Sequence, residues 1–172
     1  MSLSEILKER KIAITERWLE DIYATYPENV SSFLKRQKDQ FANPVGHALR
    51  KCTAAILDCV LEGQDMDGVR CYLEEIIKIR ALQNMLPSQA ISFILLLKKT
   101  VRTELAEYFD NQQLYSELTE FEDRIDQIAL LAFDIFIECR EKIYKLRVNE
   151  VKRNVSAIIR KFNKVDCEPV ID

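Results

Sequence analysis

The chain has 172 residues, of which 48% are hydrophobic and 31% are charged, and its formal net charge is −3. These values are ordinary for a helical protein made of one domain and an extension. No uninterrupted apolar run approaches the roughly 18 to 20 residues that span a bilayer, so we expect no integral membrane contact.

Cysteine usage and the N-terminus bear on the cellular compartment. The five cysteines are an odd number, and no charged-then-apolar leader precedes Ser2. Unpaired thiols without a secretion signal are typical of a protein in a reducing environment. We therefore expect a cytoplasmic protein.

The first predicted helix begins at a clear capping signal. Ser2 followed by Glu5 is the signature of a capping box, and apolar residues then recur at helical spacing. This pattern predicts one helix that ends near Thr25. The polar segment 26–29, with its proline, predicts a turn.

The next two helices are separated by an asparagine-proline pair. A short helix is expected over 31–40, with its basic side chains in water. Asn43 and Pro44 predict a helix start, because asparagine caps the free N–H groups and proline loses no donor there. Gly63 predicts the end of that helix in a left-handed conformation.

The C-terminal two thirds of the chain are also expected to be helical. Apolar residues over 69–82 occupy one wide helical face, and Pro87 stops and restarts the chain. The apolar helix over 88–109 is expected to be central. After a break at 110–111, a long helix is predicted over 116–165, and no window shows the alternation of a strand.

Two blocks of coiled-coil spacing mark this long helix. They cover 118–139 and 148–165, with alternating steps of three and four residues. The register slips at Ile143 and Leu146, a stutter that a continuous helix absorbs by slight unwinding. From the two blocks we predict these inter-chain contacts: Ile125, Ile128, Ala132, Ile135, Val151, Val155 and Ile158.

The length of the predicted helix implies a partner. A helix over 116–165 is roughly 75 Å long, whereas a compact chain of this size is about 40 Å across. Part of it must project, and the simplest partner for its apolar seam is the same helix of a second copy. We expect a homodimer with a globular domain over 1–145, a projecting coiled-coil helix over 146–165 and a disordered tail over 166–172.

The projecting helix is basic. Residues 140–164 hold nine Lys or Arg against Glu141 and Glu150. These charges interleave with the Val and Ile seam, as the solvated flanks of a coiled coil do. We favour that interpretation over a nucleic-acid contact, and a protein partner on the basic helix stays open.

The sequence lacks the usual patterns of catalysis and metal binding. His47 is the only histidine, which excludes most catalytic triads and all poly-histidine metal sites. The three glycines form no phosphate-binding loop, and no cysteines have metal-site spacing. We expect no enzyme activity, no metal and no cofactor. A haem held by His47, a cysteine or a tyrosine stays open as an alternative.

Polar residues gather at the Pro87 turn, beside two apolar helices. Arg80 and Gln83 lie one turn apart, and Gln89 lies in the first turn of the next helix, so all three can converge. Such a corner can bind a small anion or ligand at a helix N-terminus. In the alternative, Arg80 caps carbonyl groups and Gln89 satisfies the main chain of the turn. Together with His47, these three are the candidate ligand-binding residues.

Three segments of the chain resemble one protein family. They are Phe41-Ala42-Asn43-Pro44-Val45-Gly46-His47, then Ile79-Arg80-Ala81-Leu82-Gln83, then Pro87-Ser88-Gln89-Ala90 with Phe93 and Leu97-Lys98. Over about residues 5–145 the chain is similar to the N-terminal sensor domain of RsbR-type stressosome proteins, the RsbT co-antagonists. The resemblance implies an all-helical, globin-like domain without haem that dimerises and sends a long exit helix into a C-terminal STAS domain.

The chain departs from that family pattern at its end, because 172 residues leave no room for a STAS domain. We expect an all-α, globin-like domain whose long C-terminal helix extends into a coiled coil. The expected function is that of a non-enzymatic sensor or regulatory module. The alternatives are a cofactor-binding globin-type sensor and a helical scaffold that binds a protein partner.

Overall fold

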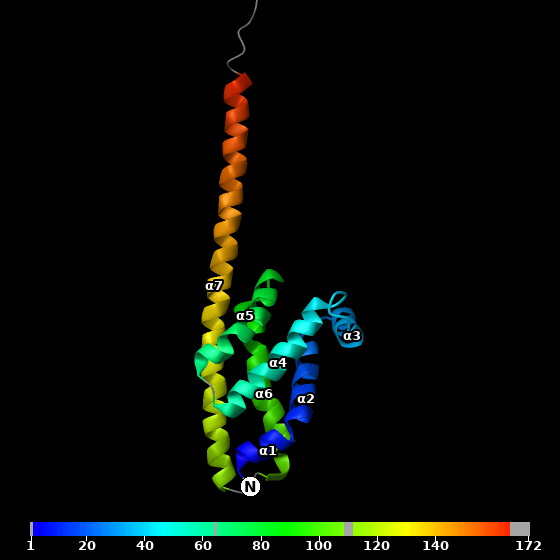
Figure 1. Cartoon of the computed structure of the whole chain (residues 1–172). Helices are drawn as coiled ribbons and strands as arrows, with labels where there is room; N and C mark the ends of the chain where they lie inside the picture. The colour runs from blue at the N-terminus through cyan, green and yellow to red at the C-terminus, as the bar shows by residue number, and fades with distance from the viewer. Residues whose placement is uncertain (1, 64, 109–111, 166–172) are drawn as a thin grey trace, which may run out of the picture.

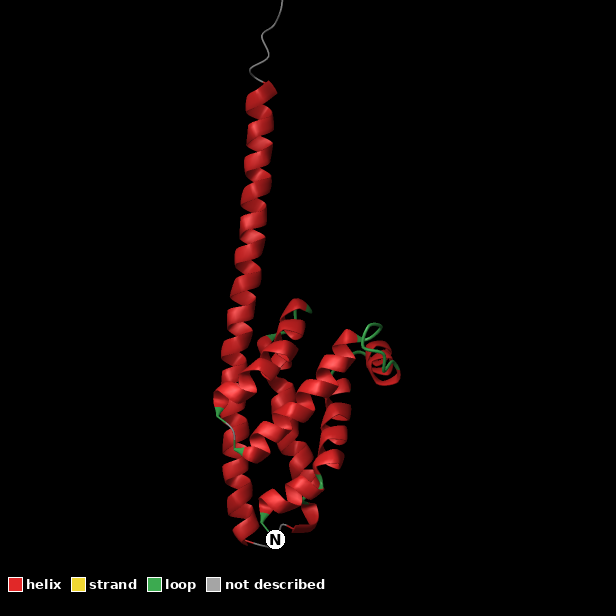
Figure 2. Cartoon of the chain, in the orientation of Figure 1, coloured by secondary structure: helices red, strands yellow, loops and turns green. Residues whose placement is uncertain are grey.

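The computed structural model is all-α in the part it describes, which is residues 2–63, 65–108 and 112–165. A body of packed helices carries one long helix that extends from it (Figures 1 and 2). The expected all-α class and the long C-terminal helix are therefore confirmed, while the tail over 166–172 lies outside the described residues. The elements are α1 Leu3–Glu9, α2 Lys11–Tyr23, α3 Glu28–Arg36, α4 Pro44–Glu62, α5 Met66–Leu82, α6 Pro87–Glu104, the 3-10 turn Ala106–Tyr108 and α7 Gln112–Val165.

The single helix predicted at the N-terminus is two helices in the structure. The capping box at Ser2 forms as predicted, because its side chain accepts from the Glu5 N–H and the Glu5 side chain accepts from the Ser2 N–H. The chain then breaks at Arg10, between α1 and α2. The Arg10 guanidinium donates to the Glu104 carbonyl oxygen at 3.0 Å and pairs with Glu107. Periodicity could not indicate this break, because apolar spacing continues across it.

Of the two helices that follow, α4 begins where it was predicted and α3 begins earlier. α3 begins at Glu28, directly after Pro27 and before the expected residue 31. α4 is capped by Asn43, whose side-chain oxygen accepts from the Gly46 N–H at 2.8 Å. A Cβ at Gly46 would lie 2.3 Å from the Asn43 amide nitrogen, so the cap requires glycine there. Gly63 ends α4 with a φ of 65°, as predicted.

The next pair of helices meets at the predicted proline corner. α5 begins after Asp65, whose carboxylate accepts from the Gly68 N–H at 3.0 Å. α6 begins at Pro87 and ends at Glu104, earlier than the expected residue 109, and the 3-10 turn 106–108 follows it. The α5–α6 corner is the turn on which the candidate site is built.

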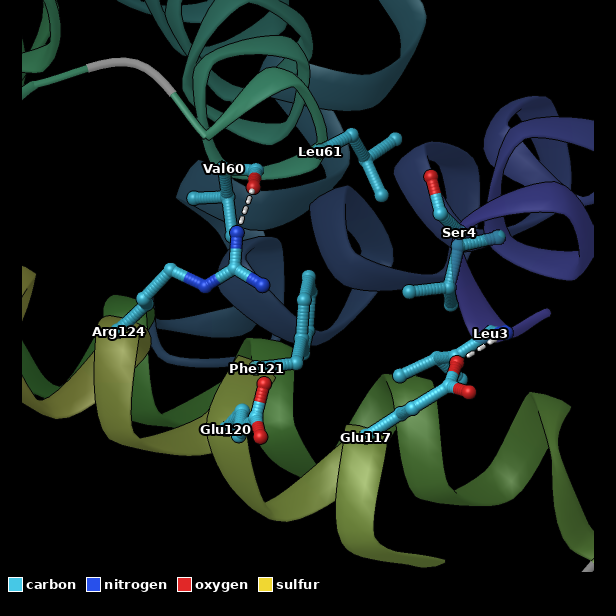
Figure 3. A pocket seen from close by; sticks show the side chains of 9 residues that line it. Leu3, Ser4, Val60, Leu61, Glu117, Glu120, Phe121 and Arg124 are labelled. Carbon is cyan, nitrogen blue, oxygen red and sulfur yellow. Dashed lines mark hydrogen bonds between the residues drawn. The ribbon is translucent and has the colours of Figure 1, made fainter. Parts of the chain in front are cut away.

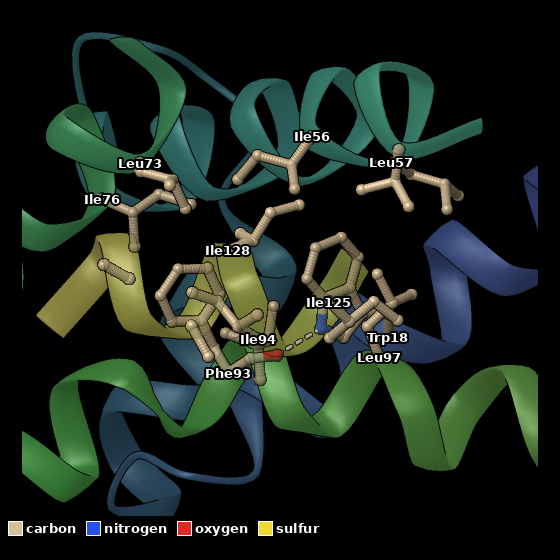
Figure 4. Close-up of a cluster of buried hydrophobic side chains, with 14 of the residues drawn as sticks. Trp18, Ile56, Leu57, Leu73, Ile76, Phe93, Ile94, Leu97, Ile125 and Ile128 are labelled. Carbon is tan, nitrogen blue, oxygen red and sulfur yellow. Dashed lines mark hydrogen bonds between the residues drawn. The ribbon is translucent and has the colours of Figure 1, made fainter. Parts of the chain in front are cut away.

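The core lies where α2, α4, α5, α6 and α7 face one another (Figure 4). Trp18 of α2 is fully buried, and its indole nitrogen donates to the carbonyl oxygen of Phe93 in α6 at 2.6 Å. The two rings stack with centroids 6.4 Å apart. Burial of each large apolar side chain contributes roughly 1.5–3 kcal/mol, so this contact fixes α2 on α6.

The long helix α7 has a packed half and a projecting half. Ile143 is its last side chain that packs against the core, and every side chain from Tyr144 to Phe162 is exposed. At about 1.5 Å per residue, the stretch 144–165 extends roughly 33 Å beyond the body. Figure 1 shows this projection as the orange and red part of α7.

Candidate functional site

The first predicted coiled-coil block lies in the core of the chain. Ile125, Ile128, Ala132 and Ile135 are each no more than 3% exposed, and the other helices of the same chain cover them (Figure 4). Their prediction as inter-chain contacts is corrected here. Steps of three and four residues also pack a helix within one chain, so spacing alone could not separate the two roles.

A different apolar row on α7 is exposed along most of its length. The same side of the helix recurs after 18 positions, or about five turns, and this interval separates Leu130 from Val148 and Ile137 from Val155. The row therefore continues from the body onto the projection, with one step, between Ile137 and Tyr144, occupied by the charged residues Arg140 and Glu141. We call it the α7 stripe, and its residues, each at least 39% exposed, are Leu130, Phe133, Ile137, Tyr144, Val148, Val151, Val155, Ile158 and Phe162.

The predicted stutter now has a structural explanation. Val148 follows Ile125 by 23 positions, or about 6.4 turns, so the two side chains point in roughly opposite directions. The first block faces the core, the second block continues the α7 stripe, and the helix between them is unbroken. Ile143 is packed against the body, whereas Leu146 is exposed on the side away from the stripe. The slip is a change of surface along one regular helix.

Ion pairs hold the packed half of α7 on its neighbours. Glu122 is almost buried, and its second carboxylate oxygen accepts from Arg102 Nη2 of α6 at 2.8 Å. This interaction raises the pKa of Arg102. One turn along the helix, Asp126 accepts from Lys98 with both oxygens at 2.9 Å. Such partly exposed pairs contribute up to about 1 kcal/mol each, so they fix register more than they add stability.

Arg140 holds α7 where it leaves the body. Its Nη1 donates to the carbonyl oxygen of Ala81, at the end of α5, and to the side chain of Asn84 at 3.0 Å. Its Nη2 donates to the hydroxyl of Tyr144 at 2.7 Å, and the guanidinium lies over that ring. Asn84 has a φ of 56°, so the turn contains one residue in the left-handed region. The α5–α6 corner is thus tied to the start of the projection.

The candidate ligand site lies on the other side of this turn and centres on Arg80. The side chain of Arg80 is 0% exposed, and its Nη1 donates to the carbonyl oxygens of Gln89 at 2.9 Å and Ala90 at 3.3 Å. The guanidinium lies 4.9 Å from the ring centroid of Phe93 and 5.5 Å from that of Tyr26. The structure therefore brings Arg80 and Gln89 together, as the sequence predicted, and adds Tyr26.

The polar atoms of this corner are only partly satisfied. The Gln89 side-chain oxygen accepts from the Leu86 N–H at 3.1 Å, which is the structural role foreseen for it. Nε and Nη2 of Arg80, and the hydroxyl of Tyr26, are buried without a hydrogen-bond partner. Burial lowers the pKa of Arg80; the Tyr26 hydroxyl opposes that shift, but no hydrogen bond of normal geometry joins the two. Capping of carbonyls thus uses only one of the three guanidinium nitrogens.

The other two candidate residues take different positions. Gln83 is exposed at the end of α5, where its N–H donates to the Ile79 carbonyl oxygen at 3.1 Å. His47 lies in the first turn of α4 and acts electrostatically on Glu75. Glu75 precedes Arg80 by about 1.4 turns of α5, on a different side of that helix. His47 is therefore not brought to the Arg80 corner.

A small cleft between α1, α4 and α7 uses its polar groups for structure (Figure 3). Arg124 donates to the carbonyl oxygen of Val60 at 3.2 Å, near the end of α4. Glu117 accepts from the Leu3 N–H at 2.7 Å, at the start of α1. A cation at a helix C-terminus and a carboxylate at an N-terminus both oppose the helix dipole, so these residues act as caps supplied by α7.

Two kinds of site are absent among the described residues. No group of three or more His, Cys, Asp or Glu side chains within the described ranges is arranged to hold a metal ion. In the same part of the chain, none of the helices combines the length and apolar character of a membrane span.

Comparison with known proteins identifies the family of this helical domain. The family model described as RsbT co-antagonist protein rsbRD N-terminal domain matches residues 12–151. Comparisons with curated proteins and with solved structures gave no significant match. The matched range includes both the Arg80 corner and the exit of α7, and the resemblance noted in the sequence is confirmed. The chain belongs to the family of N-terminal domains of rsbRD-type RsbT co-antagonist proteins.

Proposed function

We propose that the chain is a non-enzymatic, cytoplasmic regulatory module that works as a homodimer and acts on a protein partner in a stress-signalling pathway. In this proposal the body receives the signal and α7 carries it outward. The observation that carries the proposal is the α7 stripe, which leaves apolar side chains uncovered on one side of the longest helix. A globin-like arrangement of the body and a coiled coil between projecting helices are parts of the same proposal.

The exposure of the α7 stripe supports a protein contact. Leu130 is 69% exposed and Val151 is 60% exposed, although both belong to a helix that buries its opposite side. Large exposed apolar patches are uncommon on monomers and mark interaction sites. The residues Val151, Val155 and Ile158, predicted for the dimer from sequence, stay in the proposed interface. The four buried residues of the first block leave the proposed interface, and Leu130, Phe133 and Ile137 take their place in it.

A second copy of the chain is the proposed occupant, because an isolated helix of this kind is marginal. Helices in water gain most of their stability from packing an apolar face, and the stretch 144–162 packs on nothing in its own chain. Steps of three and four over 148–162 are suited to a like helix. Pairing two α7 stripes covers both copies with one contact and closes as a two-fold dimer.

A second candidate function follows from the charge of the projection. Residues 140–164 hold nine basic side chains against two acidic ones, so neighbouring helices of identical sequence bring like charges together. Arg147 and Lys152, which lie five positions apart beside the stripe, are both basic. An acidic partner helix removes that repulsion, and in this alternative the chain is a scaffold for another protein. Strong salt dependence of partner binding is its expected signature.

Hydrogen–deuterium exchange of the full chain at two protein concentrations tests the proposal. If projections pair, the amides of 148–162 exchange more slowly at high concentration, whereas those of the core segment 121–135 are equally protected at both. Free exchange of 148–162 at every concentration contradicts the homodimer. Protection that appears only when an acidic helical partner is added supports the scaffold alternative instead.

A further inference from the structure

The guanidinium of Arg80 is a buried cation without a described anionic partner. It makes two hydrogen bonds, both from Nη1 to main-chain carbonyl oxygens, and none of the described ion pairs includes it. Its remaining contacts are with the faces of two aromatic rings, Tyr26 and Phe93. Rings and carbonyls stabilise a cation but do not neutralise it.

This arrangement leaves specific donors unused. Nε of Arg80 can donate one hydrogen bond and Nη2 two, and the hydroxyl of Tyr26 can donate one. Buried polar groups without partners are rare in folded proteins, and each one is destabilising. A group that satisfies several N–H donors and a hydroxyl at once, and also neutralises a guanidinium, is a carboxylate or phosphate.

A groove lies at the same corner as Arg80 and Tyr26. It has a volume of about 570 Å³ and is lined by Thr25, Pro27, Met85, Ser88, Gln89 and Ser92. Thr25 and Pro27 flank Tyr26 in the sequence, and the carbonyl oxygen of Gln89 accepts from Arg80. Gln89 therefore contacts both the groove and the guanidinium. Ser88 lies in the first turn of α6, where main-chain N–H groups have no partner within the helix.

We propose that the Arg80 corner is a binding site for a small oxyanion, a carboxylate or a phosphate. The anion enters from the groove, displaces the Tyr26 ring outward, and pairs with Nε and Nη2 of Arg80 while accepting from the Tyr26 hydroxyl. This inference deepens the proposed function by naming the class of signal, and its regulatory meaning rests on that function. The binding chemistry itself does not.

The protein contains its own reporter for this site. Trp18 is the only tryptophan, and it lies in the core with Phe93 (Figure 4). Their rings stack, and the Arg80 guanidinium lies over the ring of Phe93. The Trp18 indole also donates to the Phe93 carbonyl oxygen at 2.6 Å. Neutralising the cation changes the electric field at the indole, so anion binding changes Trp18 emission.

The test is a fluorescence titration of the full chain at constant ionic strength. Sodium phosphate, acetate and succinate are titrated separately, with sodium chloride as the reference for ionic effects. We expect a saturable change with at least one oxyanion and none with chloride. A change with phosphate but not with acetate or succinate assigns the site to phosphate. A change with a carboxylate but not with phosphate assigns it to carboxylates.

Two variants and a matched control locate the response. Arg80→Met should abolish it, and Tyr26→Phe should weaken binding about 3- to 10-fold, the effect of one lost hydrogen bond. Tyr23→Phe is the control, because the Tyr23 hydroxyl already accepts from Arg50 at 3.2 Å. If Arg80→Met does not fold, Tyr26→Phe still decides, since that hydroxyl has no hydrogen bond to lose.

The proposal is overturned if no oxyanion gives more response than chloride, or if Tyr26→Phe binds as well as wild type. Failure of the proposed homodimer is a separate result, because the mass of the protein in solution is measured without any anion. A monomer that binds an oxyanion refutes the dimer alone, and a dimer without a response refutes only the site.

Discussion

Arg80 and Arg140 hold the two ends of the same turn. Arg140 of α7 donates to the Ala81 carbonyl oxygen at the end of α5, and Arg80 donates to the Gln89 and Ala90 carbonyl oxygens at the start of α6. The candidate anion site and the exit of α7 therefore share one short segment of main chain. A displacement of that segment at one side would change the contacts at the other, and this is the route from signal to output that the proposed function requires.

Loss of Arg140 tests this link. Arg140→Ala removes the bonds to Ala81, Asn84 and Tyr144, so we expect a loss of about 1 kcal/mol in unfolding free energy. Hydrogen exchange should also become faster over 141–148. Arg153→Ala, in the exposed part of α7 and on the side away from the α7 stripe, is the control and should change neither quantity. Equal effects of the two variants contradict a special role for Arg140.

Replacement by phenylalanine should change the free energy of unfolding differently at Tyr23 and Tyr26. Tyr23→Phe loses the hydrogen bond from Arg50 and should cost about 1 kcal/mol. Tyr26→Phe removes a buried hydroxyl without a partner, so the anion-free protein should be unchanged or slightly more stable. Urea unfolding in a buffer of chloride alone measures both. If Tyr26→Phe loses more unfolding free energy than Tyr23→Phe, the Tyr26 hydroxyl has a structural partner.

Core and stripe positions on α7 should differ in their dependence on protein concentration. Ile128→Ala leaves a cavity in the core and should cost about 2–5 kcal/mol at any concentration. Val151→Ala should have almost no effect in dilute protein and a measurable one in concentrated protein, where dimers form. Thermal unfolding over a hundredfold concentration range checks this. A concentration-independent effect at Val151 argues against its place in an interface.

The pair of Arg102 and Glu122 should show measurable coupling. The carboxylate is 10% exposed in its side chain, and Arg102 approaches both of its oxygens. A double-mutant cycle with Arg102→Met and Glu122→Gln should give a coupling of about 0.5–1 kcal/mol. The same cycle on Lys98 and Asp126, a more exposed pair, should give less. If the coupling energy is larger for Lys98 and Asp126 than for Arg102 and Glu122, burial of Glu122 does not strengthen its ion pair.

Stability should fall in alkaline solution, in part because of Cys52. Burial raises the pKa of its thiol from 9.0 to about 12, so the folded chain keeps a proton that the unfolded chain releases. The stability present below pH 9 is therefore lost as the pH rises towards 12. Urea unfolding at pH 8, 9 and 10 should show a shallower decline for Cys52→Ala than for wild type. Identical slopes would mean that Cys52 titrates normally in the folded protein.

The helical class, the caps at Asn43 and Gly63, and the Pro87 corner could be predicted because each depends on local residues. The break at Arg10 could not, since it depends on a contact with Glu104, far along the chain. The role of the first coiled-coil block was also wrong. Helix spacing fixes which residues share a side, but only the packing of α4, α5 and α6 decides whether that side is core or surface.

The candidate site was predictable to a similar degree. Arg80 and Gln89 were found because they flank a proline turn in the sequence. Tyr26 was missed, because Tyr26 next to Pro27 indicated only a turn, and nothing local placed its ring against a guanidinium 54 positions later. The α7 stripe was partly visible as the second block. Its first half could not be assigned, because Leu130 and Phe133 lie among core residues in the sequence and spacing does not decide which side of the helix is covered within the chain.

The most direct test of the account is the mass in solution of three variants by light scattering. Val155→Glu and Ile137→Glu place a charge in the two halves of the α7 stripe, whereas Leu146→Glu places one at a 70% exposed leucine on the opposite side. The account predicts a dimer for wild type and Leu146→Glu and monomers for the two stripe variants. A wild-type monomer, or dimers for all three variants, would contradict it.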